Sequence, residues 1–417
     1  MYYYDVNGAL AASFIERPLP LRSLHAGELP RLFLAEEAEG PARRNFSVTE
    51  PLLLAQKKES VHWLSRRTLT EDAADIPAAD DAVLAAVRAG CLRAVRIAQA
   101  EKPNHEPLPH IREKNAVHLL AVGDVGAQLL TGLHVLGGDC ISRIGIFDLN
   151  EAQAQRWAFE ENQILPAFRY DAMPPVEVLT QQMLFDCDVF IFTASAGVPA
   201  LGAEGDVRMA QLAANRRIIS QYARAARRAK FRGLFCVVSD PVDQLAQTVW
   251  YESNLNEEGE WDGCGLVPEQ IQGFGLGVMN ARAAYYAMRD ARFAEFLNEG
   301  RAYGPHGEGL VIANSVVHYD DALSRELTDL ARTANMKMRA MGFKPFVAPA
   351  WSSGALSILE TIRGNWHYGS VFLGGIYMGV KNRYTPHGQA HEICELPDAL
   401  MSRLEASEKL LHGDKEA

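Results

Sequence analysis

The sequence lacks two features that would place it in or across a membrane. None of its 417 residues belong to an apolar run long enough to span a bilayer. The segment from Met1 to Asp5 has neither the basic nor the apolar part of a secretory signal. We therefore expect a cytoplasmic protein that does not bind membranes.

An excess of basic charge is also missing. Asp and Glu number 52 against 41 Lys and Arg, which gives a net charge of -11 and argues against a nucleic-acid partner. A basic cluster between Arg216 and Lys230 falls on one predicted helix, and we interpret it as a solvated face. No two cysteines have the C-x-x-C spacing, so we predict free thiols and no metal site. The six are Cys91, Cys140, Cys187, Cys236, Cys264 and Cys394.

Residues 1–114 carry little regular patterning. Short apolar patches between scattered prolines predict a small α/β appendage, with one clear helix from Asp81 to about Ala100. Pro103, Pro107 and Pro109 predict a stiff linker after it. This appendage could cover a pocket, extend an oligomer interface, or do neither.

From residue 115 onward, short apolar runs alternate with amphipathic stretches. The runs at 117–122, 143–148, 188–193 and 233–238 are typical of strands buried on both faces. Helices are predicted at about 124–136, from 151, and at about 207–228. This alternation predicts an α/β domain with a doubly wound parallel sheet over residues 115–268.

The remaining residues, 269–417, predict an α+β substrate or catalytic domain. Its last helix, which carries Leu400 and Leu404, should pack back on the body. The predicted helices lie near 279–298, 320–341, 350–363 and 398–412, with short strands near 301–316 and 367–395.

A nucleotide fingerprint connects the first strand to the first helix. It reads Ala121-Val122-Gly123-Asp124-Val125-Gly126, and its glycines allow close approach of a pyrophosphate and close packing of the helix. Asp148 ends the next strand, where a carboxylate can bind the ribose 2′-hydroxyl and repel a 2′-phosphate. The segment resembles a Rossmann domain and predicts NAD as cofactor. The alternative is that Asp148 only caps the following helix.

Four further segments carry a more specific resemblance. Thr193-Ala194-Ser195-Ala196-Gly197-Val198-Pro199, followed by Arg208 and Asn215, is similar to a mobile substrate loop, and Val238 to Asp243 is similar to a Val-Ser-Asn-Pro-Val-Asp segment. Gly275 to Arg282 and Gly304 to Glu308 resemble a Leu-Asp-x-x-Arg helix start and a Gly-Glu-His-Gly-Asp turn. In this order, over about residues 115–412, the segments resemble the lactate/malate dehydrogenase family.

The resemblance implies a role for each matching residue. His306 would be the acid/base, Arg282 would bind the substrate carboxylate, and Arg208 would polarise the carbonyl. Thr193, Ala194 and Ser195 would line the cofactor site, and the protein would be a homodimer or homotetramer. Each residue also has a plainer interpretation. His306 could be an ordinary turn histidine, Arg282 a charge on a helix surface, and Arg208 a residue at a helix end without a role.

Two departures from the family pattern concern the proton relay. The family's acidic partner of the histidine would stand at position 279, which is Met279 here. The family's carbonyl-contacting asparagine aligns with Asp240. Our hypothesis is that Asp240 has taken over as the partner of His306. Alternatively, Asp240 is only a strand-end residue before Pro241.

The loop and an insertion also differ. Ala200, Leu201 and Gly202 occupy the stretch where malate-type members have an arginine, and Glu204 and Asp206 add negative charge. A plain dicarboxylate substrate is therefore disfavoured. The segment from Glu252 to Asp262 is expected to add acidic character nearby.

Three functions fit this sequence. The first is an NAD-dependent dehydrogenase of a 2-hydroxy or 2-oxo acid with a non-standard proton relay. The second is an opine-type reductase, in which Asp240 would suit a cationic iminium. The third is a catalytically inactive NAD-binding protein, consistent with Met279 but not with the joint presence of His306, Arg282 and Arg208.

Overall fold

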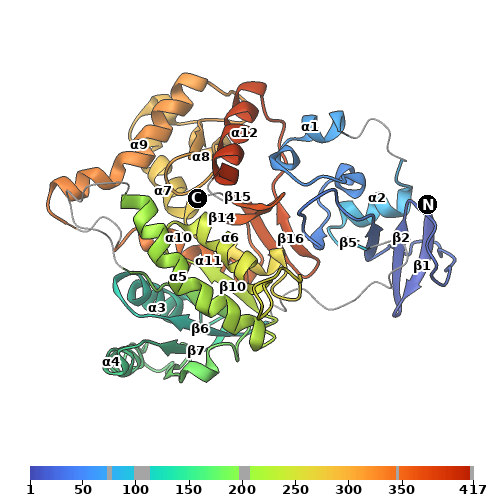
Figure 1. Ribbon diagram of the computed structural model, residues 1–417. Coiled ribbons are helices and arrows are strands. Elements are labelled where there is room, and N and C mark those ends of the chain that lie inside the picture. Colours follow the sequence, from blue (N-terminus) through green and yellow to red (C-terminus); the bar gives the residue numbers. More distant parts are fainter. Residues whose placement is uncertain (73–77, 98–112, 197–206, 344–346, 414–417) are drawn as a thin grey trace.

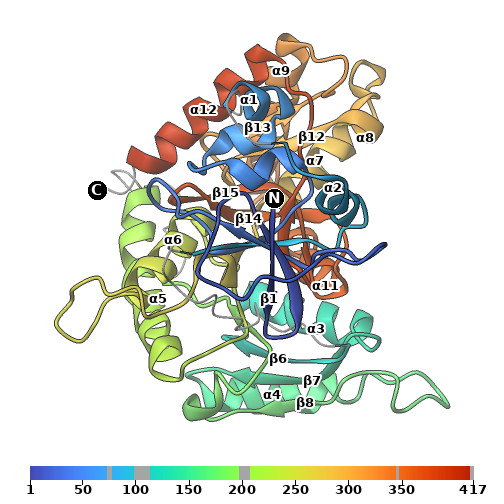
Figure 2. The same ribbon diagram turned by 90° about the vertical axis from the view of Figure 1, so that its right-hand side faces the viewer.

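The computed structural model describes residues 1–72, 78–97, 113–196, 207–343 and 347–413, without side chains for 207–210. A large nine-stranded sheet forms the body, and a five-stranded sheet forms a separate N-terminal layer beside it (Figure 1 and Figure 2). A two-stranded sheet, β12 (Arg301–Tyr303) with β13 (Val311–Ala313), completes the strands. No described helix is long and apolar enough to cross a membrane.

Six parallel strands form one side of the large sheet, from the edge strand β8 inward, in the order β8-β7-β6-β9-β10-β11. This is the 3-2-1-4-5-6 order of a dinucleotide-binding Rossmann sheet, so the predicted fold class is confirmed. The strands are β6 (Asn115–Leu120), β7 (Ile141–Phe147), β8 (Val176–Val178), β9 (Val189–Phe192), β10 (Leu234–Val237) and β11 (Ile271–Gly273).

Helices cover both faces of these strands because alternate side chains are apolar on both sides. In β9, Val189 and Ile191 pack on the side of α3 (Asp124–Leu136) and α4 (Glu151–Glu161). Phe190 and Phe192 pack on the opposite side, against the third and fourth crossover helices. Those helices are α5 (Val207–Arg228) and α6 (Val242–Ser253).

The sheet continues beyond the parallel strands. β14 (His367–Leu373) pairs antiparallel with β11, and β15 (Ile376–Thr385) and β16 (Gly388–His391) follow in turn. Strands from before and after residue 268 therefore share one sheet, and the domain division at that residue stays a prediction.

The helices of the C-terminal part agree with the sequence pattern except in two places. The stretch predicted near 279–298 divides into α7 (Leu276–Ala287), a 3-10 turn and α8 (Phe296–Glu299). The stretch predicted at 350–363 divides at Gly354, where a Cβ atom would lie 2.4 Å from Leu129. The other helices are α9 (Asp321–Ala340), α10 (Ala350–Ser353), α11 (Ala355–Arg363) and α12 (Asp398–Gly413).

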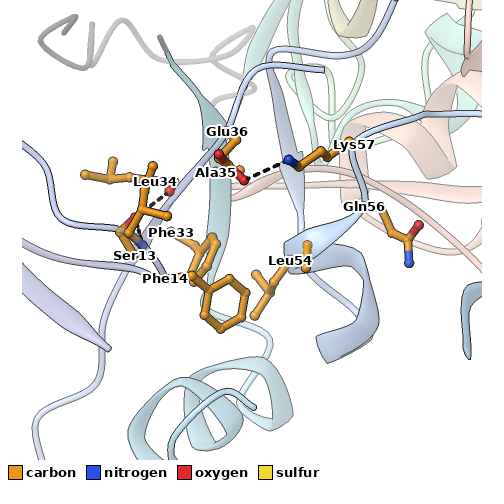
Figure 3. A pocket seen from close by; sticks show the side chains of 11 residues that line it. Ser13, Phe14, Phe33, Leu34, Ala35, Glu36, Leu54, Gln56 and Lys57 are labelled. Atoms are coloured by element: carbon orange, nitrogen blue, oxygen red, sulfur yellow. Dashed lines mark hydrogen bonds and ion pairs between the residues drawn. The ribbon is translucent and has the colours of Figure 1, made fainter. Parts of the chain in front are cut away.

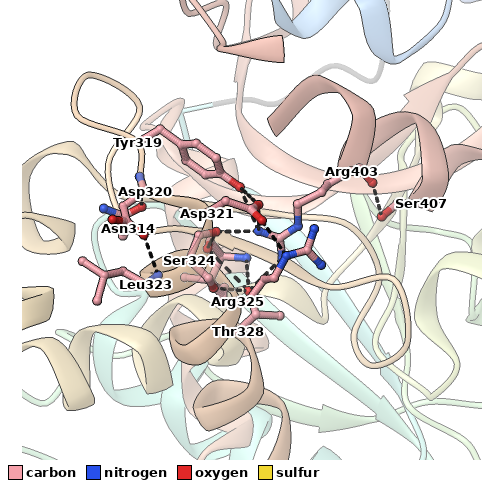
Figure 4. Close-up of polar contacts among 11 residues, drawn as sticks. Asn314, Tyr319, Asp320, Asp321, Leu323, Ser324, Arg325, Thr328, Arg403 and Ser407 are labelled. Carbon is pink, nitrogen blue, oxygen red and sulfur yellow. Dashed lines mark hydrogen bonds and ion pairs between the residues drawn. The ribbon is translucent and has the colours of Figure 1, made fainter. Parts of the chain in front are cut away.

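Helix α12 packs on the body, as predicted, with Leu400 and Leu404 fully buried. Its Arg403 reaches across to the start of α9 and donates hydrogen bonds to the hydroxyls of Tyr319 (3.0 Å) and Ser324 (2.6 Å) (Figure 4). Burial and this polar contact together fix the C-terminal helix against α9.

The N-terminal layer is an α/β unit with the strand order β1-β2-β3-β5-β4. The predicted helix from Asp81 to about Ala100 is wrong in its extent, because α2 ends at Arg88 and Gly90 turns the chain with a φ of 64°. The apolar residues after this turn form strand β5, and the predicted proline linker lies outside the described residues. The elements are β1 (Tyr2–Val6), β2 (Ala9–Ser13), β3 (Leu32–Ala35), β4 (Asn45–Ser47), α1 (Arg66–Glu71), α2 (Asp81–Arg88) and β5 (Arg93–Arg96).

This N-terminal unit packs against the edge of the large sheet that is formed by β16, where β4 lies against β16. Arg43 and Glu59, both fully buried, form an ion pair of 2.7 Å. His391 of β16 contacts the Trp63 carbonyl oxygen through Nε2 (3.1 Å) and Arg43 through Nδ1 (3.4 Å). The unit therefore covers a sheet edge that would otherwise be open to other strands.

Candidate functional site

The nucleotide fingerprint has the geometry that a bound pyrophosphate requires. A Cβ atom at Gly123 would meet nothing within 4 Å, so the space before α3 is open. At Gly126 a Cβ would lie 2.1 Å from the Ala121 carbonyl oxygen and 2.8 Å from Thr193 Oγ1, so only glycine permits this packing. The N–H groups of the first turn, which begins with Asp124 and Val125, carry the positive end of the helix dipole.

Asp148 lies beside this fingerprint at the end of β7. Its carboxylate accepts hydrogen bonds from the backbone N–H groups of Val122 (2.9 Å) and Asn150 (2.8 Å). The residue that caps α4 is Asn150, so the alternative of Asp148 as the helix cap is wrong. Asp148 is partly exposed.

The end of β9 closes the other side of the fingerprint. Thr193 Oγ1 lies 2.7 Å from the Ala121 carbonyl oxygen and 2.8 Å from that of Leu120. The Ala194 carbonyl oxygen accepts a hydrogen bond of 2.6 Å from Ser239, which follows β10. The segment from Thr193 to Ser195 thus connects the nucleotide fingerprint to the residues around Asp240.

His306 and Asp240 meet although 66 residues separate them in sequence. Asp240 follows β10 and is joined to Pro241 by a cis peptide bond, and His306 lies in the turn after β12. His306 Nδ1 is 2.9 Å from Asp240 Oδ1, with a quarter of the imidazole and about half of the carboxylate exposed. The carboxylate therefore holds the imidazole at Nδ1 and fixes the orientation of the ring.

Arg282 presents a cation close to this pair. Its Nη1 lies 3.9 Å from Met279 Sδ and 3.5 Å from the Ala331 carbonyl oxygen, and it forms no ion pair within the described residues. Burial lowers the pKa of the guanidinium, and the charge of Asp240 opposes this effect. A half-buried guanidinium that forms no ion pair with a described carboxylate is suited to bind an anionic group.

Met279 is 2% exposed and packs in the apolar cluster around α7. Its thioether contacts Arg282, and it has no group that could hold a proton for His306. The position of the family's acid is therefore occupied by an apolar side chain, while a carboxylate reaches His306 from Asp240.

Arg208 is the second residue of α5, which starts at Val207. Its side chain lies outside the described residues, as do Ala200, Leu201, Gly202, Glu204 and Asp206 of the loop. Their predicted roles stay predictions.

Asp243 is a site residue to which sequence reasoning gave no role. It is buried, accepts a hydrogen bond from Ser370 (2.6 Å), and accepts one from the backbone N–H of His306 (3.4 Å). Burial raises its pKa to about 6, and the bonds from Ser370 and His306 partly oppose the rise. Its place at the end of the Val238 to Asp243 segment, which the family resemblance singles out, is the signal that could have identified it.

Asn215 is a second site residue to which sequence reasoning gave no role, although it belongs to the segment that resembles the substrate loop. Fully buried in α5, it accepts from the Ala196 N–H (2.8 Å) and donates to the carbonyl oxygen of Asp240 (2.7 Å). It therefore fixes the segment after β9 to the residue that holds His306.

The acidic insertion is not near the site, which corrects the expectation from sequence. It leaves the far end of α6, and a helix of this length places it about 18 Å from Asp240. Glu252 and Asp262 form ion pairs with Arg224 (2.7 Å) and Arg227 (2.5 Å) of α5. Two members of the basic cluster are thus paired with this insertion instead of facing only solvent.

One group of possible metal ligands occurs among the described residues, away from this site. It comprises Glu295, Glu299 and His318. Glu299 already accepts hydrogen bonds from Ser315 and from His318, so two of the three side chains are paired within the protein.

Comparison with known proteins finds an NAD-binding domain over the residues that contain the nucleotide fingerprint. Residues 115–259 match the family described as lactate/malate dehydrogenase, NAD binding domain. Residues 115–259 are therefore similar to the NAD-binding domain of lactate/malate dehydrogenases.

Curated relatives match at low identity. The L-lactate dehydrogenase 1 of Bacillus cereus (strain ATCC 10987 / NRS 248) is 27% identical over 202 residues, which cover 46% of this chain and 56% of the relative. The L-lactate dehydrogenase 2 of Bacillus anthracis is 26% identical over 172 residues, 41% of this chain and 48% of the relative. The chain therefore spans about half the length of these lactate dehydrogenases.

Solved structures of the family share the fold over a longer part of the chain. The minor L-lactate dehydrogenase of Enterococcus mundtii has a TM-score of 0.57 at 18% identity and covers 72% of this chain and 98% of its own. The malate dehydrogenase of Picrophilus torridus has a TM-score of 0.57 at 15% identity, covering 72% and 96%. At these identities the likeness establishes the fold.

Proposed function

We propose that this protein belongs to the lactate/malate dehydrogenase family and is an NAD-dependent dehydrogenase that interconverts a 2-hydroxy acid and a 2-oxo acid, with His306 and Asp240 as its proton relay. The observation that carries the proposal is the 2.9 Å contact between His306 Nδ1 and Asp240 Oδ1 beside Arg282. Histidine is suited to this work because its proton exchanges near neutral pH.

The residues around the fingerprint fit NAD. Gly123 leaves room for the pyrophosphate, Gly126 brings α3 close, and Asp148 would bind the ribose 2′-hydroxyl. When bound, the nicotinamide supplies or accepts the hydride. Thr193, Ala194 and Ser195 would line the same site.

Each polar residue has one task in the reduction of a 2-oxo acid. Arg282 would bind the carboxylate in a bidentate manner and so orient the carbonyl. Arg208 would polarise the carbonyl oxygen from the loop. His306 would donate the proton from Nε2 to that oxygen as the carbonyl carbon receives the hydride, giving the hydroxyl. Asp240 would stabilise the imidazolium before transfer.

The same carboxylate supports a second candidate reaction. Asp240 occupies the position where the family has a neutral asparagine against the carbonyl oxygen, and about half of it is exposed. A negative charge there would attract an iminium formed from a 2-oxo acid and an amine. Opine-type reduction therefore uses the same residues with a different substrate.

The first test measures oxidation of NADH with a panel of 2-oxo acids, each with and without amines. Turnover with the acid alone supports the first reaction, and turnover only with an amine supports the second. NADH binding without turnover of any acid or acid–amine pair would leave only the inactive alternative, which the replacement of an acid by Met279 favours.

The second test concerns the relay. Asp240→Asn has nearly the same shape and should lower kcat/KM by about 100-fold or more, because general acid–base catalysis depends on the partner of the imidazole. Asp398→Asn, an exposed carboxylate in α12, is the control and should retain activity. Unchanged turnover in Asp240→Asn would refute the relay.

A double variant makes this test sharper. Asp240→Asn with Met279→Asp recreates the family's arrangement and should recover part of the activity that Asp240→Asn loses. Circular dichroism would check that the buried aspartate has not unfolded α7. A folded double variant no more active than Asp240→Asn would show that the partner role was not exchanged between these positions.

A cytoplasmic location and assembly as a homodimer or homotetramer belong to the same proposal, by resemblance to the family. Size-exclusion chromatography with light scattering would determine the oligomeric state.

A further inference from the structure

The N-terminal unit contains a cavity that the reaction does not use. It lies at the carboxyl ends of β2 and β3, which run parallel to each other and to β5. Part of its wall is formed where each strand ends, by Ser13 and Phe14 at β2 and by Ala35 and Glu36 at β3 (Figure 3). Crevices at the carboxyl ends of parallel strands are the usual ligand sites of open α/β sheets.

The inner part of this cavity is apolar. Phe33 and Leu54 are almost fully buried, while Phe14 remains partly exposed, with its ring 4.9 Å from that of Phe33. Figure 3 shows the three side chains converging on one another. An apolar group entering here would cover the exposed part of Phe14, which favours binding.

The rim carries charges of both signs. Lys57 Nζ and Glu36 Oε2 lie 3.5 Å apart, and both side chains are about half exposed. Behind the wall, the buried Arg17 donates hydrogen bonds to the carbonyl oxygens of Leu34 (3.3 Å) and Ala35 (2.9 Å). An exposed pair such as Lys57–Glu36 contributes little to stability, so ligand groups can replace either partner at small cost.

The volume limits the size of a ligand. The cavity measures about 220 Å³, whereas one of about 150 Å³ already holds a benzene molecule. There is room for one apolar side chain with its polar head group at the rim. A dinucleotide is far too large.

We propose that this cavity binds an α-amino acid with an apolar side chain, in its zwitterionic form. The carboxylate would pair with Lys57, and the ammonium would pair with Glu36. The side chain would lie against Phe14, Phe33 and Leu54. A carboxylate alone would leave Glu36 next to a like charge, and an amine alone would do the same for Lys57.

The site is independent of the proposed dehydrogenase reaction. Its lining comes from residues 13–57, and the cofactor and relay residues come from positions 121–306. Failure of one proposal therefore leaves the other standing.

Isothermal titration of the full chain tests the site with L-leucine and L-phenylalanine as probes. We expect one binding site per chain. Two truncated probes, 4-methylpentanoate without the ammonium and 3-methylbutylamine without the carboxylate, should bind at least tenfold more weakly than L-leucine. The variant His306→Ala should bind L-leucine unchanged, which separates this site from the relay.

Charge variants assign the two contacts. Glu36→Gln should weaken L-leucine at least fivefold and 4-methylpentanoate little, while Lys57→Gln should weaken both. The adjacent exposed residues supply matched controls, Glu37→Gln and Lys58→Gln, which should bind as the unmodified protein does. Absence of binding by both amino acids at millimolar concentration, equal binding of 4-methylpentanoate, or binding abolished by His306→Ala would overturn the proposal.

Discussion

At the scale of single residues, Ala121 adopts a backbone conformation usual for glycine. Its φ is 72°, because the chain must turn sharply between β6 and α3 to bring the fingerprint to the strand ends. An L-residue with a Cβ is strained there by about 1–2 kcal/mol. The Ala121 carbonyl oxygen nevertheless keeps its contacts with Thr193 and Gly126. The turn is thus maintained against a local preference.

Replacing Ala121 with glycine should relieve this strain. We expect Ala121→Gly to raise the free energy of unfolding by up to about 1 kcal/mol, since the strain removed exceeds the added chain entropy of glycine. Ala127→Gly, one turn into α3, makes the same chemical change and should lower stability by about 1 kcal/mol. Thermal and urea unfolding measure both, and a destabilised Ala121→Gly would contradict the strain.

At the scale of elements, α5 is fixed to the strand ends through Asn215. Seven residues separate Asn215 from Arg208, so two helical turns connect the anchored end to the loop. The anchor contacts both the Ala196 backbone and the carbonyl oxygen of Asp240. The position of the helix and that of the relay are therefore determined by one buried side chain.

Asn215→Ala should reduce catalysis and stability together. It leaves the Ala196 N–H and the Asp240 carbonyl oxygen without these bonds, a loss of about 1–3 kcal/mol. We expect kcat to fall about tenfold or more with little change in NADH affinity, because the fingerprint is untouched. Ser220→Ala on the same helix removes only a bond to Arg216 and is the control. An unaltered kcat would refute the positioning role.

At the scale of the whole molecule, the N-terminal unit is joined to the large sheet through buried polar groups. Arg43 faces Glu59, and His391 lies between Arg43 and the Trp63 carbonyl oxygen. Burial lowers the pKa of His391 to about 3, and the charge of Arg43 acts in the same direction. The imidazole of His391 is therefore neutral in the seam, the contact between the N-terminal unit and the large sheet. Its protonation would weaken this contact.

Stability should consequently fall in acid. A histidine with a depressed pKa contributes stability that is complete above its unfolded value, about 6.5, and is lost as the pH falls toward 3. Between pH 6.5 and pH 5 the loss from His391 is about 2 kcal/mol. Urea unfolding at the two pH values should show a smaller loss in His391→Gln, with exposed His25→Gln as the control. Equal losses in all three proteins would contradict this role.

The sequence by itself predicted what depends on local patterns. Apolar runs and amphipathic periodicity located β6, β7, β9, β10 and helix α5, and the spacing of Gly123 and Gly126 identified the nucleotide fingerprint. Prediction from the sequence failed where an apolar pattern fits either a helix or a strand. The apolar residues from Val83 to Ile97 fit a helix until Gly90 divides them into α2 and β5.

Only the tertiary structure decided how distant residues combine. The contact of His306 with Asp240, the burial of Asp243 beneath them, and the seam from Arg43 to His391 join segments 63–348 residues apart. Sequence suggested the first as a hypothesis and gave no sign of the last. Hydrophobic periodicity records which face of an element is buried, but the partner on that face depends on the packing of the whole chain.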